Sequence, residues 1–96
     1  MNLKETEGYK LLIKAILSLE SEEECENFLE DLLTRKEIAD SAQRLLVAKL
    51  LSEQVVYSKI AEKTGASTAT ISRVNRSLMY GNDGYSVVFG RMENNE

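Results

Sequence analysis

The side chains best suited to chemistry lie between residues 58 and 76, where short hydroxyl residues are interspersed with lysines and arginines. Hydroxyl groups both donate and accept hydrogen bonds, and guanidinium groups bind phosphates and guanine edges through a fixed fork of donors. Such residues within one short segment indicate recognition of an anionic partner by direct hydrogen bonds. The candidate contact residues are Ser58, Lys59, Lys63, Ser67, Thr68, Ala69, Thr70, Ser72, Arg73 and Arg76.

Catalysis and metal binding have little support in this sequence. The chain has no histidine and a single cysteine, Cys25, so the common zinc ligand sets and the Cys–His nucleophile are missing. Acidic residues cluster between Glu22 and Asp31, on a helical pattern where charged side chains usually face water. We therefore expect no enzyme activity, no metal and no cofactor; a carboxylate-based enzyme is the weakest alternative.

Charge is unevenly distributed along the chain, whose formal net charge is −4. Residues 1–33 carry three basic and nine acidic residues, whereas residues 57–80 carry four basic residues and one acidic residue. An anionic partner is therefore repelled by most of the molecule and attracted to one end. The distribution favours a focused contact over nonspecific binding to polyanions.

Helical periodicity runs through almost the whole chain. Ser21, Thr34 and Ser67 each precede a helical pattern and are suited to be N-caps, and Glu37 completes a capping box with Thr34. No signal peptide precedes the first helix and no apolar run is long enough to span a membrane, so we expect a soluble, cytoplasmic protein. The fold predicted is all-α with five helices, at about residues 4–20, 21–33, 34–53, 58–64 and 68–80.

The last two predicted helices have the spacing of a helix-turn-helix, over about residues 58–80. Ala61 is small where two helix axes approach, and Gly65 can take the positive φ that a tight turn needs. Ile71 and Val74 then face inward at helical spacing. These four residues form the predicted core of the motif. The contact residues face outward, so the second helix can enter a DNA major groove about 12 Å wide.

Two of the predicted helices are too apolar for a small monomer. Residues 11–19 and 45–51 are hydrophobic around most of the helix, and such helices must be buried on most sides. A chain of this size buries only about 60–65% of its unfolded surface by itself. We therefore expect a homodimer, with a compact monomer exposing some leucines as the alternative.

The C-terminal segment 81–96 differs from the helical domain expected over residues 1–80. It opens with Gly81-Asn82-Asp83-Gly84, a cluster typical of a turn. Tyr85–Phe89 then has the composition of a strand, but a single short strand is not stable alone. The segment is either a docked tail or a flexible end that becomes ordered on a partner.

The residues from Gly65 to Leu78 resemble the tryptophan repressor (TrpR) superfamily. Upstream, Leu33-Thr34, Glu37 and Arg44 resemble a helix of the same family. Leu78–Gly81 and the downstream Gly84-Tyr85 resemble its TrpR-related YerC/YecD branch. The resemblance covers roughly residues 30–90. It implies an all-helical, intertwined homodimer in which the N-terminal helices of two chains interlock.

The resemblance also bears on a small-molecule effector. Thr34, Arg44, Arg73 and Ser77 fall on the family's corepressor positions, but Val74 stands where the repressor has a glycine against the bound indole. A valine side chain would fill much of that space, so we expect tryptophan not to bind. Arg44 is then better explained as an ion-pair residue at the surface or at an interface.

Together these observations predict a homodimeric regulator that binds a specific sequence of double-stranded DNA, with repression as the expected outcome. The alternative is a protein-interaction module that retains the helix-turn-helix shape without binding DNA, because the local charge is small and the chain has no basic arm.

Overall fold

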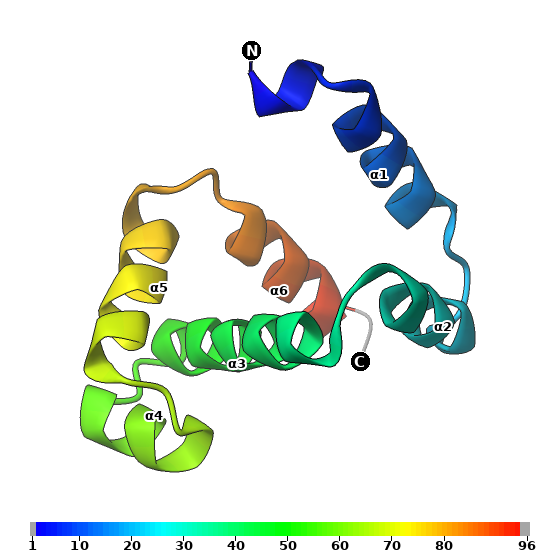
Figure 1. Ribbon diagram of the computed structural model, residues 1–96. Coiled ribbons are helices and arrows are strands. Elements are labelled where there is room, and N and C mark those ends of the chain that lie inside the picture. Colours follow the sequence, from blue (N-terminus) through cyan, green and yellow to red (C-terminus); the bar gives the residue numbers. More distant parts are fainter. Residues whose placement is uncertain (1, 95–96) are drawn as a thin grey trace. The chain divides into compact units, whose positions relative to one another are not determined.

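The computed structural model describes residues 2–94, whose regular secondary structure consists of helices alone, without a strand (Figure 1). The all-α prediction is confirmed, but the prediction of five helices was wrong, because residues after the expected end of the domain form a sixth. The elements are a 3-10 turn η1 (Leu3–Glu5) and the helices α1 (Glu7–Ser18), α2 (Glu22–Leu32), α3 (Arg35–Ser52), α4 (Tyr57–Thr64), α5 (Thr68–Tyr80) and α6 (Gly84–Asn94).

Side-chain caps fix the starts of the first helices. The amide N–H of Glu24 donates to Oγ of Ser21 at 3.1 Å, which starts α2. At the start of α3 the amide of Glu37 donates to Oγ1 of Thr34 at 3.1 Å, and the amide of Thr34 donates to Oε1 of Glu37 at 2.9 Å. This reciprocal pair is the predicted capping box, which satisfies two amides that the helix itself leaves unpaired.

The capping box makes the stability of α3 depend on pH. The backbone amide of Thr34, followed by its hydroxyl, holds the pKa of the Glu37 carboxyl below its ordinary value of 4.5. Because the folded-state pKa is lowered, this contribution is present above the unfolded-state pKa and is lost as the pH falls through the folded-state pKa. We expect the NMR titration of the Glu37 carboxyl carbon to have its midpoint below 4.5.

The matched variant is Glu37→Gln, whose amide oxygen can still accept the Thr34 hydrogen bond but does not titrate. The stability difference between the two proteins should therefore shrink on acidification. A midpoint at or above the ordinary value would show that the carboxylate does not cap α3 in solution.

The chain divides into two compact units, one up to Ile38 and one from Ala39 onward. All fully buried side chains of the described residues lie in the second unit. Four helices contribute to this core, with the C-terminal half of α3 running through it. Its members are Val47, Ala48, Leu50, Ile60, Ala66, Ile71, Val74 and Phe89.

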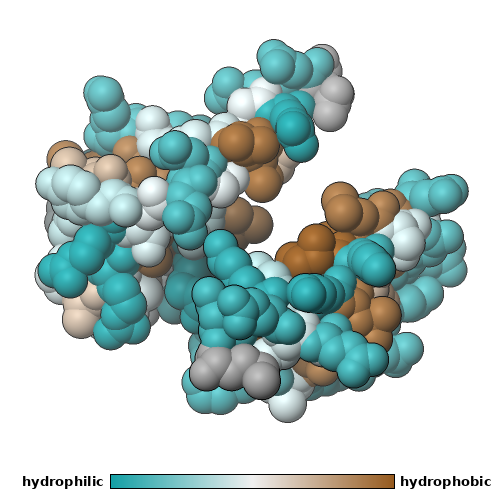
Figure 2. Space-filling model, turned by 90° about the horizontal axis from the view of Figure 1, so that it is seen from above, coloured by the Kyte–Doolittle hydropathy of each residue, from teal (hydrophilic) through white to brown (hydrophobic). Residues whose placement is uncertain are grey.

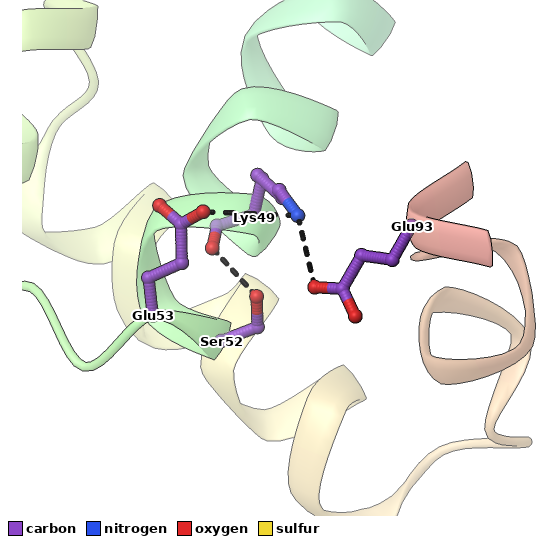
Figure 3. A network of polar contacts seen from close by, with 4 residues as sticks. All are labelled: Lys49, Ser52, Glu53 and Glu93. Atoms are coloured by element: carbon purple, nitrogen blue, oxygen red, sulfur yellow. Dashed lines mark hydrogen bonds and ion pairs between the residues drawn. The ribbon is translucent and has the colours of Figure 1, made fainter. Parts of the chain in front are cut away.

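Helix α6 is anchored to α3 by one aromatic side chain and one lysine. Phe89 is only 6% exposed, and its ring stacks on Tyr85 with centroids 5.9 Å apart. Lys49 places its Nζ 5.2 Å from the centroid of the Phe89 ring. The same Nζ lies 3.7 Å from a carboxylate oxygen of Glu53 and 3.7 Å from one of Glu93 (Figure 3). Residues 84–94 therefore complete the core of the second unit.

The first unit exposes its hydrophobic residues. Neither α1 nor α2 has a buried side chain, and Leu11 and Leu17 of α1 are 66% and 79% exposed. Figure 2 shows the hydrophobic surface that results on this unit. Exposed apolar surface of this extent is characteristic of a contact face. Within residues 2–94, no helix combines the length and apolar character that crossing a membrane requires.

Candidate nucleic-acid interface

Helices α4 and α5 pack against each other across a tight turn, as predicted for residues 58–80. Gly65 ends α4 in the left-handed conformation, with φ of 73°, and its amide donates to the carbonyl of Ala61 at 2.9 Å. Ala61 is half-buried and packs against the core. A side chain at position 65 would meet no neighbouring atom, so the requirement for glycine comes from the backbone conformation alone.

The turn is reinforced by two residues that were not predicted from the sequence, Thr64 and Gln43. The hydroxyl of Thr64 donates to the carbonyl of Ile60 at 2.7 Å and accepts from the amide of Ala66 at 3.1 Å. The carbonyl of Thr64 accepts from Nε2 of Gln43, on α3, at 3.1 Å. A threonine just before the glycine that ends a helix is a local sequence signal for the two hydrogen bonds of the Thr64 hydroxyl. No sequence signal indicates the hydrogen bond from Gln43.

Helix α5 begins at the predicted cap and buries the predicted face. Oγ of Ser67 accepts from the amide of Thr70 at 3.1 Å. Ile71 is fully buried and Val74 is 3% exposed, so both pack into the core of the second unit. These contacts fix which side of α5 faces solvent.

The opposite side of α5 carries a continuous polar and basic stripe. Its residues follow one another at intervals of three and four, the spacing that places side chains on one face of a helix. All of them are exposed. The two arginines among them, Arg73 and Arg76, make no ion pair within residues 2–94. The stripe consists of Thr68, Ala69, Ser72, Arg73 and Arg76.

The remaining candidate contact residues flank this stripe. Ser58, Lys59 and Lys63 are exposed on α4, and Ser67 is exposed at the turn. Thr70 differs from the rest: it is half-buried, and its hydroxyl accepts from Oγ of Ser67 at 3.1 Å. At about 100° per residue, position 70 falls between the exposed and the buried faces of α5, so its side chain is not fully outward as predicted.

The residues at the corepressor positions have other roles in this structure. Thr34 belongs to the first unit and caps α3. Arg44 is exposed and donates from a terminal guanidinium nitrogen to Oγ of Ser41 at 3.3 Å, and Ser77 donates to the carbonyl of Arg73 at 3.4 Å. Val74 points into the core.

An open groove of about 460 Å³ lies where α3, α5 and α6 meet, and its walls are mainly apolar. Of the four corepressor positions, Ser77 alone is among its lining residues. The other lining residues are Leu45, Gly81, Asn82, Gly84, Tyr85 and Val88. Elsewhere in the described part of the chain, no three cysteine, aspartate or glutamate side chains are grouped so that they could hold a metal ion.

A capped helix that presents a polar and basic stripe, held by a glycine turn against a second helix, defines a helix-turn-helix protein. Comparison with known proteins identifies which kind. The family described as Trp repressor protein matches residues 7–93, and the chain belongs to that family. The predicted resemblance to TrpR-related proteins is thereby confirmed.

Its relatives match over nearly the whole chain. The uncharacterized protein YerC of Bacillus subtilis (strain 168) is 49% identical over 98 residues, which cover 100% of this chain and 94% of that protein. The crystal structure of a TrpR-like protein from Eubacterium eligens ATCC 27750 has a TM-score of 0.92 and 55% identity. A structure from Staphylococcus aureus, described as that of a proposed Trp repressor, has a TM-score of 0.89 and 45% identity. Both alignments cover 97% of this chain and 96% of the other.

Proposed function

We propose that this protein is a homodimeric transcriptional regulator that binds a specific sequence of double-stranded DNA. The observation that carries the proposal is the exposed stripe on α5, whose arginines have no acidic partner within residues 2–94 and which lies opposite the buried Ile71 and Val74. A buried acidic partner for Arg73 or Arg76 would have argued against it.

The dimensions of α5 suit a major groove. Its 13 residues correspond to a length of about 20 Å at about 1.5 Å per residue. The small side chains of Thr68 and Ala69 at its start allow close approach to base edges, where hydroxyl and methyl groups discriminate between bases. Arg73 and Arg76, further along, reach guanine edges or phosphates. Lys59 and Lys63, which are exposed on α4, then contact the phosphate backbone.

The exposed apolar surface of the first unit supports the homodimer. Covering Leu11 and Leu17 with the same surface of a second copy removes that surface from water and gives the two-fold symmetry common in oligomers. Two recognition helices then read half-sites about 34 Å apart, in successive major grooves. A dimer bound near a promoter competes with polymerase, so repression is the expected sign of regulation.

Selection of the preferred duplex from a random pool tests this function. We expect an enriched, near-palindromic sequence whose half-sites lie about one helical turn apart, because the two recognition helices are related by two-fold symmetry. The selected duplex should compete at physiological salt against fragmented genomic DNA. No enrichment, or a monomer in sedimentation analysis, would contradict the proposal.

The second candidate is a protein-interaction module with the same fold. It is favoured by the small local charge, since residues 57–80 carry only four basic residues and one acidic residue. Few phosphate contacts mean weak electrostatic attraction to DNA. A gel shift with the selected duplex at physiological salt separates the two candidates: retention of the duplex supports the regulator, and its absence supports the interaction module.

Tryptophan is not expected to be the effector of this protein. Val74 is 3% exposed and is part of the core, where the repressor has a glycine against the bound indole. Inserting a large ring beside a packed valine costs about 1–3 kcal/mol, and a pocket of this kind depends on close contact. Isothermal titration should therefore detect no binding of tryptophan at micromolar concentration. Saturable micromolar binding would show that α5 shifts enough to open the site.

A further inference from the structure

Gln43 connects the helix-turn-helix to the helix that precedes it. Its half-buried side chain extends from α3, and Nε2 donates to the carbonyl of Thr64 at 3.1 Å. The two residues are 21 positions apart, whereas the capping bonds of the chain join residues two to four positions apart. This hydrogen bond therefore depends on the position of α4 relative to α3.

The acceptor is a carbonyl that α4 itself does not use. Thr64 is the last residue of α4, and the final carbonyls of a helix have no partner within it. Directly after it, Gly65 turns the chain into the left-handed conformation that leads to α5. A hydrogen bond to the Thr64 carbonyl therefore acts at the turn that sets the direction of α5, the recognition helix.

The core that α3 shares with the helix-turn-helix is apolar. Val47 and Ala48 of α3 share the core with Ile60 and Ile71, and apolar contacts of this kind are not directional. A hydrogen bond weakens steeply when its angle departs from linear. The core thus holds α4 and α5 against α3, while the Gln43 bond restricts their rotation on it.

We propose that Gln43 is a positioning residue that sets the angle of the recognition helix to α3, and through it the half-site spacing that the dimer accepts. The inference rests on the proposed function, because spacing has a meaning only for a dimer on DNA. Gln43 does not touch the DNA in this arrangement; it acts through the Thr64 carbonyl.

The test compares three variants on the selected duplex and on duplexes whose half-sites are moved one base pair closer or further apart. Gln43→Leu keeps the size and removes the donor. Gln43→Lys restores an N–H donor of similar reach. Ser41→Ala is the control, because that hydroxyl bonds only within α3.

We expect Gln43→Leu to lower the preference for the optimal spacing by about three- to tenfold, the range that one hydrogen bond contributes. Gln43→Lys should recover most of that preference, and Ser41→Ala should retain all of it. A uniform loss of affinity at every spacing in Gln43→Leu would overturn the proposal, since a merely structural role weakens binding without changing the preferred spacing.

A second measurement does not depend on DNA. Amide hydrogen exchange at Gly65 and Ala66 should be about threefold faster or more in Gln43→Leu, with exchange in the middle of α3 unchanged. Unchanged exchange at the turn would overturn the proposal even where DNA binding is altered. If the wild-type protein selects no duplex, the proposed function fails and the role in spacing with it; the exchange rates then show separately whether Gln43 orders the turn.

Discussion

Replacing Phe89 with alanine is expected to lower the free energy of unfolding by about 3–5 kcal/mol, the usual cost of truncating a buried aromatic side chain. The ring is 6% exposed and belongs to the core that also contains Val74 of the recognition helix. Its loss removes the stacking on Tyr85 and the contact with the Lys49 ammonium. For a domain of this size that is a large part of the total stability.

The change is measured as a shift of the denaturant midpoint, followed by circular dichroism at a fixed protein concentration, because dimerisation would couple stability to concentration. Ser86→Ala is the matched control: Ser86 is exposed on the same helix, and its substitution should change stability by less than about 0.5 kcal/mol. A Phe89→Ala protein as stable as the control would mean that α6 does not pack on α3 in solution.

The contrast between α6 and the rest of the fold shows which parts of a structure a sequence determines locally. Ser21, Thr34 and Ser67 bond to amides three residues ahead, and Gly65 takes the positive φ that the turn requires. Each of these features is decided by a few consecutive residues. For that reason the starts of α2, α3 and α5 and the helix-turn-helix were predicted correctly, whereas the first helix, expected from about residue 4, begins at Glu7.

Helix α6 was missed because its conformation is decided by distant contacts. Tyr85–Phe89 contains two valines, and a β-branched residue favours a strand by at most about 1 kcal/mol, a preference that depends on what it packs against. Burying the side chain of Phe89 is worth about 1.5–3 kcal/mol, more than the preference of either valine. The helical conformation is what lets Phe89 reach the core while Lys49 and Glu93 pair.

In the candidate site, too, the features set by neighbouring residues could be predicted and those set by distant contacts could not. Which face of α5 is exposed could be predicted from the spacing of Ile71 and Val74, and the stripe lies where that spacing puts it. The bond between Gln43 and Thr64 could not be predicted, because nothing in the sequence around either residue indicates a partner 21 positions away. Thr70, which was predicted to face outward, is half-buried because it lies at the border of the two faces.

Replacing both Arg73 and Arg76 with alanine is expected to weaken binding of the selected duplex severely. Each arginine that reads a guanine contributes about 1–3 kcal/mol, so the double variant should bind about 30-fold more weakly or worse. Both side chains are exposed and make no ion pair within residues 2–94, so their loss leaves no acidic partner without its cation. Fluorescence anisotropy with the labelled duplex gives the dissociation constants, and unchanged thermal unfolding verifies the fold.

Two single variants separate charge from recognition. Arg91→Ala removes one positive charge from an exposed position on α6, outside the helix-turn-helix, and should leave affinity within about twofold. Lys59→Ala, at a phosphate contact, should weaken binding equally for all sequences and lower the slope of affinity against salt by about one unit or less. If the double arginine variant behaves like Lys59→Ala, the arginines contact phosphates alone, and base recognition rests on Thr68, Ala69 and Ser72.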